Sequence, residues 1–140
     1  MRHQRKDNKL NMQRDHRALL LRNMATSIIL YEKVKTTIAR ARQVRPIVED
    51  LITKAKTKDK RNAIRQIAKV IMDPNASKKL LEVLKERFKN RPGGYTRVIK
   101  LGFRSGDGAK LVSVQLLGQA ESEATGALKK ELPNKANPEA

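Results

Sequence analysis

The sequence has no cysteine and no tryptophan, and its aromatic side chains are only Tyr31, Phe88, Tyr95 and Phe103. The absence of thiols excludes disulfides, thiolate zinc sites, iron–sulfur clusters and cysteine nucleophiles, and it fits a reducing compartment. Many single-strand binders stack bases on several exposed rings, and four scattered aromatics do not easily build such a surface. The core must therefore come from Leu, Ile, Val and Ala.

Long apolar runs are also missing. The longest, such as Leu19 to Leu21 and Ile28 to Tyr31, fall far short of the roughly 20 residues that a helix needs to cross a bilayer. The chain is charged from Arg2 onward with no apolar stretch behind it, so its start is not typical of a secretory signal. We therefore expect no membrane partner.

Acidic residues are scarce: 32 lysines and arginines face 14 aspartates and glutamates, a net charge of +18. Setting aside the three lysines and four glutamates after Gly118 leaves 29 basic and 10 acidic residues, so the excess belongs to the body of the chain. Such a charge repels itself in a compact domain, and contact with phosphates relieves the repulsion. The composition indicates a polyanion partner, most simply a nucleic acid.

No catalytic or metal-binding pattern stands out. His3 and His16 are the only histidines, and neither lies with acids at ligand spacing. Glu49 and Asp50 are adjacent in an expected helix, so their side chains diverge. The segment Gly106-Asp107-Gly108 lacks the phosphate-loop pattern and is interpreted as a hairpin turn. We expect no enzyme activity, no cofactor, no metal and no small-molecule substrate.

The chain divides into three parts. Residues 1–14 are a basic arm expected to be disordered alone, residues 15–118 form one globular domain, and residues 119–140 lack periodicity and are expected to be a disordered extension. In the domain, Asp15 is expected to cap a helix that starts at His16. Its inward stripe is expected to be Leu20, Met24, Ile28 and Tyr31.

A short strand at 33–37 is followed by a helix from Thr37, its N-cap, to about Lys56. We expect Pro46 to kink this helix near Arg42 to Pro46 or to divide it into two segments. Its apolar face carries Ala41, Val44, Val48, Leu51 and Ala55.

Two more helices and two strands complete the pattern. A third helix presents Arg61, Arg65 and Lys69 as one ridge, with Ile64, Ile67 and Ile71 on its other face. Asp73-Pro74-Asn75 can cap a fourth helix, whose inward residues are Leu80, Leu84 and Phe88. Alternation after Gly94 predicts a strand, and Leu111 to Leu117 a second strand, joined to the first by a hairpin turn at 105–109.

The segment Gly93-Gly94-Tyr95-Thr96-Arg97 has two readings of equal weight on spacing alone. Paired glycines permit close approach of a phosphate to the backbone, a hydroxyl of Tyr95 or Thr96 can donate to it, and Arg97 adds a planar fork of donors. Alternatively, the segment is a helix-to-strand turn with Tyr95 packed inward. Spacing alone leaves both readings open.

An ordered set of residues resembles the bacterial large-subunit ribosomal protein family numbered seventeen. The matching stretches lie between residues 1 and about 118. They are Arg2-His3, Leu10-Asn11, His16-Arg17, Arg22-Asn23-Met24-Ala25, Ser27, Glu32, Thr36-Thr37, Leu51-Ile52-Thr53, Ala55-Lys56, Gly93 to Arg97, Gly102, Arg104, Gly106-Asp107 and Ala109. No single stretch is specific, but their order and spacing together are. Because the resemblance includes Gly93 to Arg97, we adopt the phosphate-contact reading of that segment as the hypothesis.

The resemblance implies a two-layer α+β fold, with three or four helices on a small mixed sheet of about three strands that includes the C-terminal hairpin. It also implies a non-catalytic protein of the ribosome, in the cytoplasm or the equivalent organellar compartment, that binds large-subunit ribosomal RNA beside other ribosomal proteins. The expected position is the solvent side, near the peptide exit tunnel. The physical mechanism would be a rigid basic domain that bridges RNA segments, plus an arm that orders on binding.

The residues expected to contact RNA are basic or polar and lie along most of the domain and arm. They are Arg2, His3, Arg5, Lys6, Lys9, Arg14, His16, Arg17, Arg22, Asn23, Lys35, Thr36, Arg40, Arg42, Arg61, Arg65, Lys69, Gly93, Gly94, Tyr95, Thr96, Arg97 and Arg104. Two alternatives remain. A basic nucleoid-type DNA-binding protein would use the same charge, although no recognition helix stands out, and an RNA-modifying enzyme would need acid–base groups that are not found.

Overall fold

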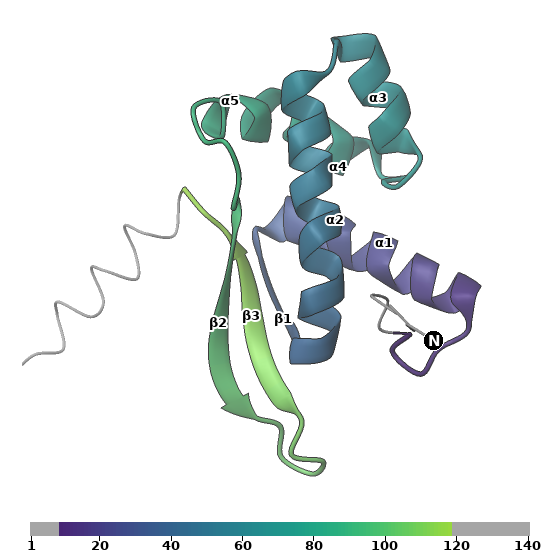
Figure 1. Ribbon diagram of the computed structural model, residues 1–140, viewed down its shortest axis with the longest axis vertical. Coiled ribbons are helices and arrows are strands. Elements are labelled where there is room, and N and C mark those ends of the chain that lie inside the picture. The colour runs from purple at the N-terminus through teal and green to yellow at the C-terminus, as the bar shows by residue number, and fades with distance from the viewer. Residues whose placement is uncertain (1–8, 119–140) are drawn as a thin grey trace, which may run out of the picture.

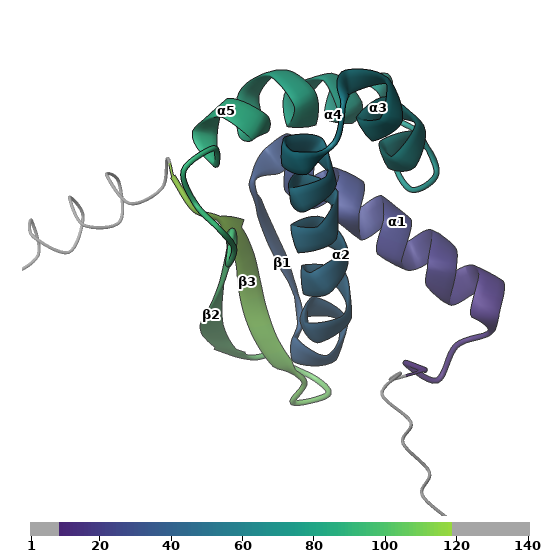
Figure 2. The same cartoon turned by 45° about the horizontal axis from the view of Figure 1, so that its top comes forward.

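The structure, a computed structural model, describes residues 9–118; most of the expected arm and all of the expected tail lie outside this range. A three-stranded sheet is flanked on one side by helices (Figures 1 and 2). The elements are α1 (Arg14–Tyr31), β1 (Lys33–Thr37), α2 (Ile38–Thr57), α3 (Lys60–Ala68), α4 (Pro74–Lys79), the π-helical turn η1 (Leu80–Leu84), α5 (Lys85–Arg87), β2 (Thr96–Phe103) and β3 (Lys110–Leu116). The expected two-layer α+β class is confirmed.

The sheet has the order β1-β3-β2, and both strand pairs are antiparallel. The expectation of a mixed sheet is therefore wrong. The predicted hairpin joins β2 to β3, and Leu101 bulges out of the register between Lys100 and Gly102. β3 is the central strand, and its Val112 and Val114 are buried in the core. β2, by contrast, is exposed along its whole length after Thr96. The sheet therefore has a buried centre and an open edge.

Helix α2 lies between the sheet and the other helices, and it supplies the middle of the core. All five apolar residues predicted for its inward face are buried, together with Ile52. Thr37 is the N-cap as predicted, although its side chain makes no capping hydrogen bond. Pro46 lies inside one continuous helix, so of the two expected alternatives, a kink or a division into two segments, the division is wrong. Proline removes a single backbone donor, and the apolar face on both sides of it packs against the same core.

Helix α1 differs from its prediction in start and in face. It begins at Arg14 with Gln13 as N-cap, so Asp15 lies in the first turn and is not the cap. Tyr31, expected inside, is 74% exposed. The buried residues are Leu21, Ala25, Ile28 and Ile29. Ala25 is small and fully buried, so it is part of the packed face. Two adjacent stripes of α1 have helical spacing, and tertiary packing, which the spacing does not reveal, decides which of them is buried.

The remaining helices follow the prediction with two corrections. In α3 the buried residues are Ala63 and Ile67, whereas Ile64 is 45% exposed, because this short helix packs only a narrow stripe. The Asp73 side chain caps α4 by accepting a hydrogen bond from the Asn75 amide at 2.8 Å, as predicted. Beyond it, the predicted inward residues Leu80, Leu84 and Phe88 are all buried, but the helix widens into the π turn η1.

One carboxylate ties the helices to the sheet at the end of α1. Glu32 has left-handed backbone geometry (φ 59°) and accepts two hydrogen bonds from Arg87, at 2.7 and 3.2 Å. Lys79 lies 2.7 Å from the same carboxylate and also donates to the Leu30 carbonyl at 2.8 Å. The Arg87 hydrogen bonds lower the Glu32 pKa; burial opposes the shift and Lys79 adds to it. We call Glu32, Lys79 and Arg87 the junction.

Candidate nucleic-acid interface

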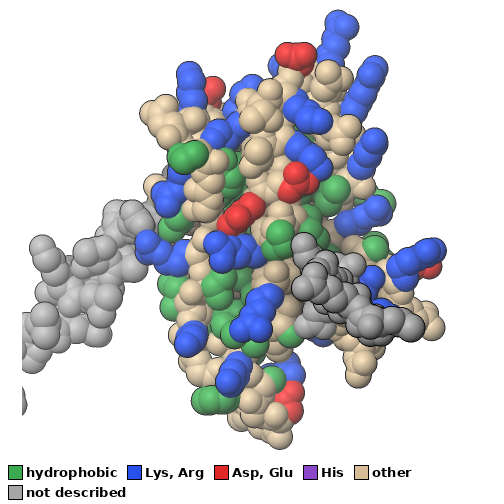
Figure 3. Space-filling view, viewed as in Figure 1, with side chains coloured by type: hydrophobic (Ala, Val, Ile, Leu, Met, Phe, Trp, Pro, Cys, Tyr) green, Lys and Arg blue, Asp and Glu red, His purple; other side chains and the backbone are tan. Residues whose placement is uncertain are grey.

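On the face seen in Figure 3, cationic side chains are spread widely and acidic ones are few and scattered. Several of these acids are already paired within the chain. On α2, Glu49 accepts from Arg45 at 3.1 Å and Asp50 pairs with Lys54. The cations left over elsewhere therefore define the surface available to a polyanion.

The α3 ridge, Arg61, Arg65 and Lys69, is fully on the surface. All three residues are exposed, and no carboxylate of residues 9–118 forms an ion pair with any of them. Spacing of four places Arg61 and Arg65 on one side of the helix, and Lys69 follows as the C-cap. The ridge is the clearest group of uncompensated cations in the described part of the chain.

The open face of the sheet carries a second basic group. The register aligns Lys33 of β1, Gln115 of β3 and Arg97 of β2 in one row. Because strand side chains alternate, this row points away from the core-facing Val114 row, toward the side with no described helix (Figure 2). Lys35 follows two residues after Lys33 on the same face and is exposed. A cationic sheet face of this kind can contact phosphates without deep insertion.

The loop before β2 is held from inside the protein. The Tyr95 ring is buried against Phe88, with ring centroids 5.0 Å apart, and its hydroxyl donates to the Pro92 carbonyl at 3.3 Å. Lys56 donates to the Tyr95 hydroxyl at 3.1 Å and also to the Arg91 carbonyl. The structure therefore places the Tyr95 side chain inward, as in the alternative structural reading, and not on the surface as we had hypothesised.

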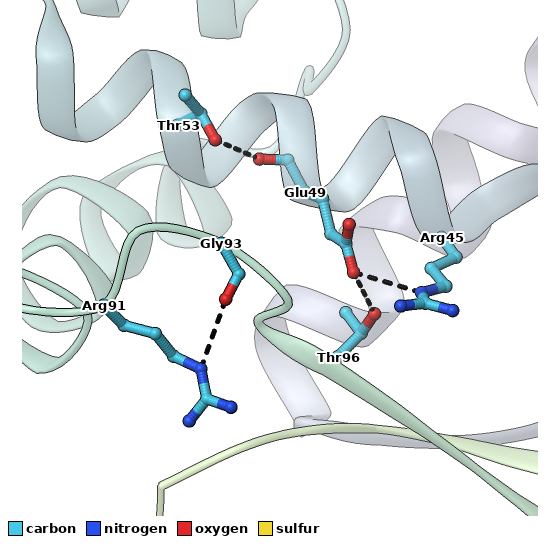
Figure 4. A network of polar contacts seen from close by, with 6 residues as sticks. All are labelled: Arg45, Glu49, Thr53, Arg91, Gly93 and Thr96. Atoms are coloured by element: carbon cyan, nitrogen blue, oxygen red, sulfur yellow. Dashed lines mark hydrogen bonds and ion pairs between the residues drawn. The ribbon is translucent and has the colours of Figure 1, made fainter.

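Thr96 is buried as well. Its hydroxyl donates to Glu49 at 2.7 Å, and the same carboxylate oxygen accepts from Arg45 (Figure 4). Neither hydroxyl of the loop faces outward, because both have partners in the fold. What the loop exposes is Gly93, Gly94 and Arg97. Gly94 needs to be glycine for its backbone (φ +64°), and beside Gly93 there is open space where the backbone is accessible.

The other expected contact residues fall into three groups. Arg2, His3, Arg5 and Lys6 lie outside the described residues. Thr36 is buried, and Arg17, Arg22 and Arg40 are half-buried. The exposed members are Lys9, Arg14, His16, Asn23, Lys35, Arg42, Arg61, Arg65, Lys69, Gly93, Gly94, Arg97 and Arg104. Arg104 is paired at the hairpin turn with Asp107, and this pairing lowers the Asp107 pKa to about 2.

The sequence-based set omits cations that the sheet brings together. Lys33 stands in the same row as Arg97, and Lys100 and Lys110 lie on the two strands of the hairpin near its turn. The alternation of the two strands was readable from sequence and would have placed Lys100 and Lys110 near one another. Their closeness to Arg42 of α2 depends on tertiary packing and was not readable.

Fold and surface together define the class: a compact α+β protein with a strongly basic exterior. Within residues 9–118 no group of three or more histidine, aspartate or glutamate side chains is placed to hold a metal ion. No helix in that range has the length and apolarity required to cross a membrane.

Comparison with known proteins gives the family. The family model described as "Ribosomal protein L17" matches residues 20–117. The Rickettsia bellii protein "Large ribosomal subunit protein bL17" is 45% identical over 117 residues, covering 84% of this chain and 82% of its own. The proteins of the same name from Desulforudis audaxviator (46% identical; 78% and 96% covered) and Syntrophotalea carbinolica (43%; 97% and 85%) are similar too. The chain belongs to the ribosomal protein L17 family, a structural and non-enzymatic one.

Proposed function

We propose that this protein, a structural constituent of the large ribosomal subunit, is held there by binding large-subunit ribosomal RNA through phosphate and shape contacts. Its place is in the cytoplasm, on the solvent side of the subunit near the peptide exit tunnel and beside other ribosomal proteins. Residues 1–8 would add Arg2, Arg5 and Lys6 to the interface. Similarity to proteins named as large-subunit components supports the assignment.

The observation that carries the RNA contact is the distribution of uncompensated cations. The α3 ridge presents exposed cations that form no ion pair with a carboxylate of residues 9–118, and Lys33 and Lys35 on the open sheet face do the same. The acids of α2, by contrast, are neutralised by their own helix. Neutralising phosphates with such groups releases condensed counterions, which supplies affinity without sequence readout. The rigid fold fixes where these cations stand and so gives the contact its shape dependence.

The test is binding of the full chain to large-subunit ribosomal RNA over a range of salt concentrations. With about ten phosphate contacts, log affinity should fall with log salt at a slope of roughly −7 to −9. Duplex DNA of matched length serves as competitor. A slope near zero would refute the phosphate mechanism, and equal affinity for DNA would favour a nucleoid-type protein over a specific ribosomal RNA binder.

A further inference from the structure

A groove of about 400 Å³ lies between the start of α2 and the turn end of the β2–β3 hairpin. Ile38 and Arg42 line it from α2, Lys100 and Phe103 from β2, and Lys110 and Leu111 from β3. Figure 3 shows cationic and hydrophobic side chains side by side over this end of the sheet. The groove is separate from the α3 ridge and from the loop at residues 93–97.

The lining combines two chemistries. Ile38, Leu111 and the Phe103 ring give an apolar wall, and Arg42, Lys100 and Lys110 supply three cations. No acidic residue of the described chain lines the groove. The nearest acid along the hairpin, Asp107, is bound to Arg104 by hydrogen bonds, one of them 2.9 Å long. The local charge therefore favours an anion, while the wall favours something flat and apolar.

Phe103 stands out in this lining because it is 70% exposed, although phenylalanine usually buries its ring. It pairs with Lys110 across the hairpin, and this pair lies between the bulge at Leu101 and the hairpin turn. An exposed ring beside three cations matches the two parts of a nucleotide, because a base can stack on the ring while its phosphate meets the cations.

We propose that this groove holds one unpaired nucleotide of an RNA, with its base stacked on Phe103 and its phosphate bound by Lys100, Lys110 and Arg42. The inference rests on the proposed RNA-binding function and deepens it by assigning one site to an extruded nucleotide. An acidic protein segment is the rival occupant. The three cations around a flat aromatic wall favour the nucleotide, since its charge and its planar group lie one sugar apart.

The experiment compares two RNA hairpins with the same stem, one fully paired and one with a single bulged 2-aminopurine nucleotide. The full chain should bind the bulged hairpin more tightly and quench its fluorescence by stacking. Phe103→Leu keeps an apolar side chain but removes the ring, so it should lower affinity for the bulged hairpin by about fivefold to tenfold and abolish the quenching. Phe103→Tyr keeps the ring and should retain both effects.

The matched control is Tyr31→Leu, which removes an aromatic that is 74% exposed at the end of α1, away from the groove. It should leave both hairpins unaffected. Lys100→Gln should weaken binding of the bulged hairpin and reduce the salt slope by about one. Thermal unfolding checks that each variant stays folded, which is expected because the substituted side chains are exposed.

Equal binding of the two hairpins by the wild type, or an unchanged preference for the bulged hairpin in Phe103→Leu, overturns the proposal. If the paired hairpin is still bound, the general RNA-binding function stands. Loss of all RNA binding would remove both. A glutamate-rich peptide with a central leucine tests the rival. If it binds in a Phe103-dependent way and the bulged nucleotide does not, the groove belongs to a protein.

Discussion

The junction and the α3 ridge use the same residue types in opposite ways. In the junction, the Arg87 and Lys79 side chains are only 14% and 26% exposed, and both are bound by Glu32. On the ridge, Arg61 and Arg65 extend into solvent without a carboxylate partner among residues 9–118. One set of cations holds helices to the sheet, and the other is free to meet a polyanion.

The difference shows why a charge count overstates the interface. The 26 lysines and arginines of residues 9–118 include some that the fold consumes, and only three-dimensional pairing separates them from those that face outward. If the comparison is right, substitutions at the junction should change stability and leave RNA affinity nearly intact, and substitutions on the outer surfaces should do the reverse.

Glu32→Gln should have the largest effect. It leaves Arg87 and Lys79 largely buried without a counter-charge, which should cost about 3 kcal/mol in the free energy of unfolding, the low end for a broken buried pair because the groups keep some exposure. The melting temperature should fall by roughly 12 °C. Thermal and denaturant unfolding measure the change.

The control for that variant is Asp15→Asn, which breaks the Arg14–Asp15 pair, whose side chains are 88% and 92% exposed. Surface pairs of this kind contribute at most about 1 kcal/mol. Similar losses in the two variants would mean that the junction is no more than another surface pair.

Arg97→Glu should come second. It reverses one charge in the row with Lys33 on the open sheet face and should weaken binding to ribosomal RNA by about 2 kcal/mol, a typical value for a charge-assisted hydrogen bond. Folding should persist, because Arg97 is exposed. RNA affinity is measured beside thermal unfolding, with Lys129→Glu, in the expected C-terminal extension, as control. Unfolding of Arg97→Glu, or binding equal to the control, would show that this row is structural.

The double variant Arg61→Gln with Arg65→Gln should lower RNA affinity by about tenfold and reduce the magnitude of the salt slope by about 1.5. Its matched control, Arg45→Gln with Lys54→Gln, removes the same charge from cations that are paired with Glu49 and Asp50. Gel-shift titrations at several salt concentrations compare them. Equal losses would mean that total charge, and not uncompensated charge, sets the affinity.

The smallest effect concerns pH. The Glu32 pKa is lowered from its ordinary value of 4.5, chiefly by the Arg87 hydrogen bond. A carboxyl group whose pKa is lowered in the folded state stabilises the protein at pH values above its unfolded-state pKa. That stabilisation is lost as the pH falls through its folded-state pKa. The stability gap between wild type and Glu32→Gln should therefore be constant above pH 4.5 and narrow below it. A gap that widens on acidification would contradict the assignment.

Local patterns were enough to find most elements. The alternation at 33–37 predicted β1. Thr37 and the five apolar residues that follow it at helical spacing predicted α2, because an element that packs on many sides shows its period clearly. Asp73-Pro74-Asn75 predicted its cap for a similar reason, since that hydrogen bond is made within three residues. These signals are local, and so they are readable.

The errors fall where a distant contact decides. Tyr31 and Ile64 point outward because neighbouring helices pack on adjacent stripes, and Tyr95 turns inward to meet Phe88 and Lys56, the latter 39 residues away in sequence. The sequence predicted which residue types the candidate interface contains, but not which of those residues share one surface. The pairing of Arg87 with Glu32, 55 residues apart, has no sequence signature.

The open edge at β2 bears on the protein before it reaches its subunit. An edge strand offers unpaired backbone donors and acceptors to any passing chain, and a long apolar one invites polymerisation into β-aggregates. Here Arg97 and Lys100 stand on that strand, and the bulge at Leu101 interrupts its regular repeat. Newly made copies that outnumber their sites on ribosomal RNA should thus stay apart. The positive charge that serves the interface should also oppose edge-to-edge aggregation of the free protein before assembly.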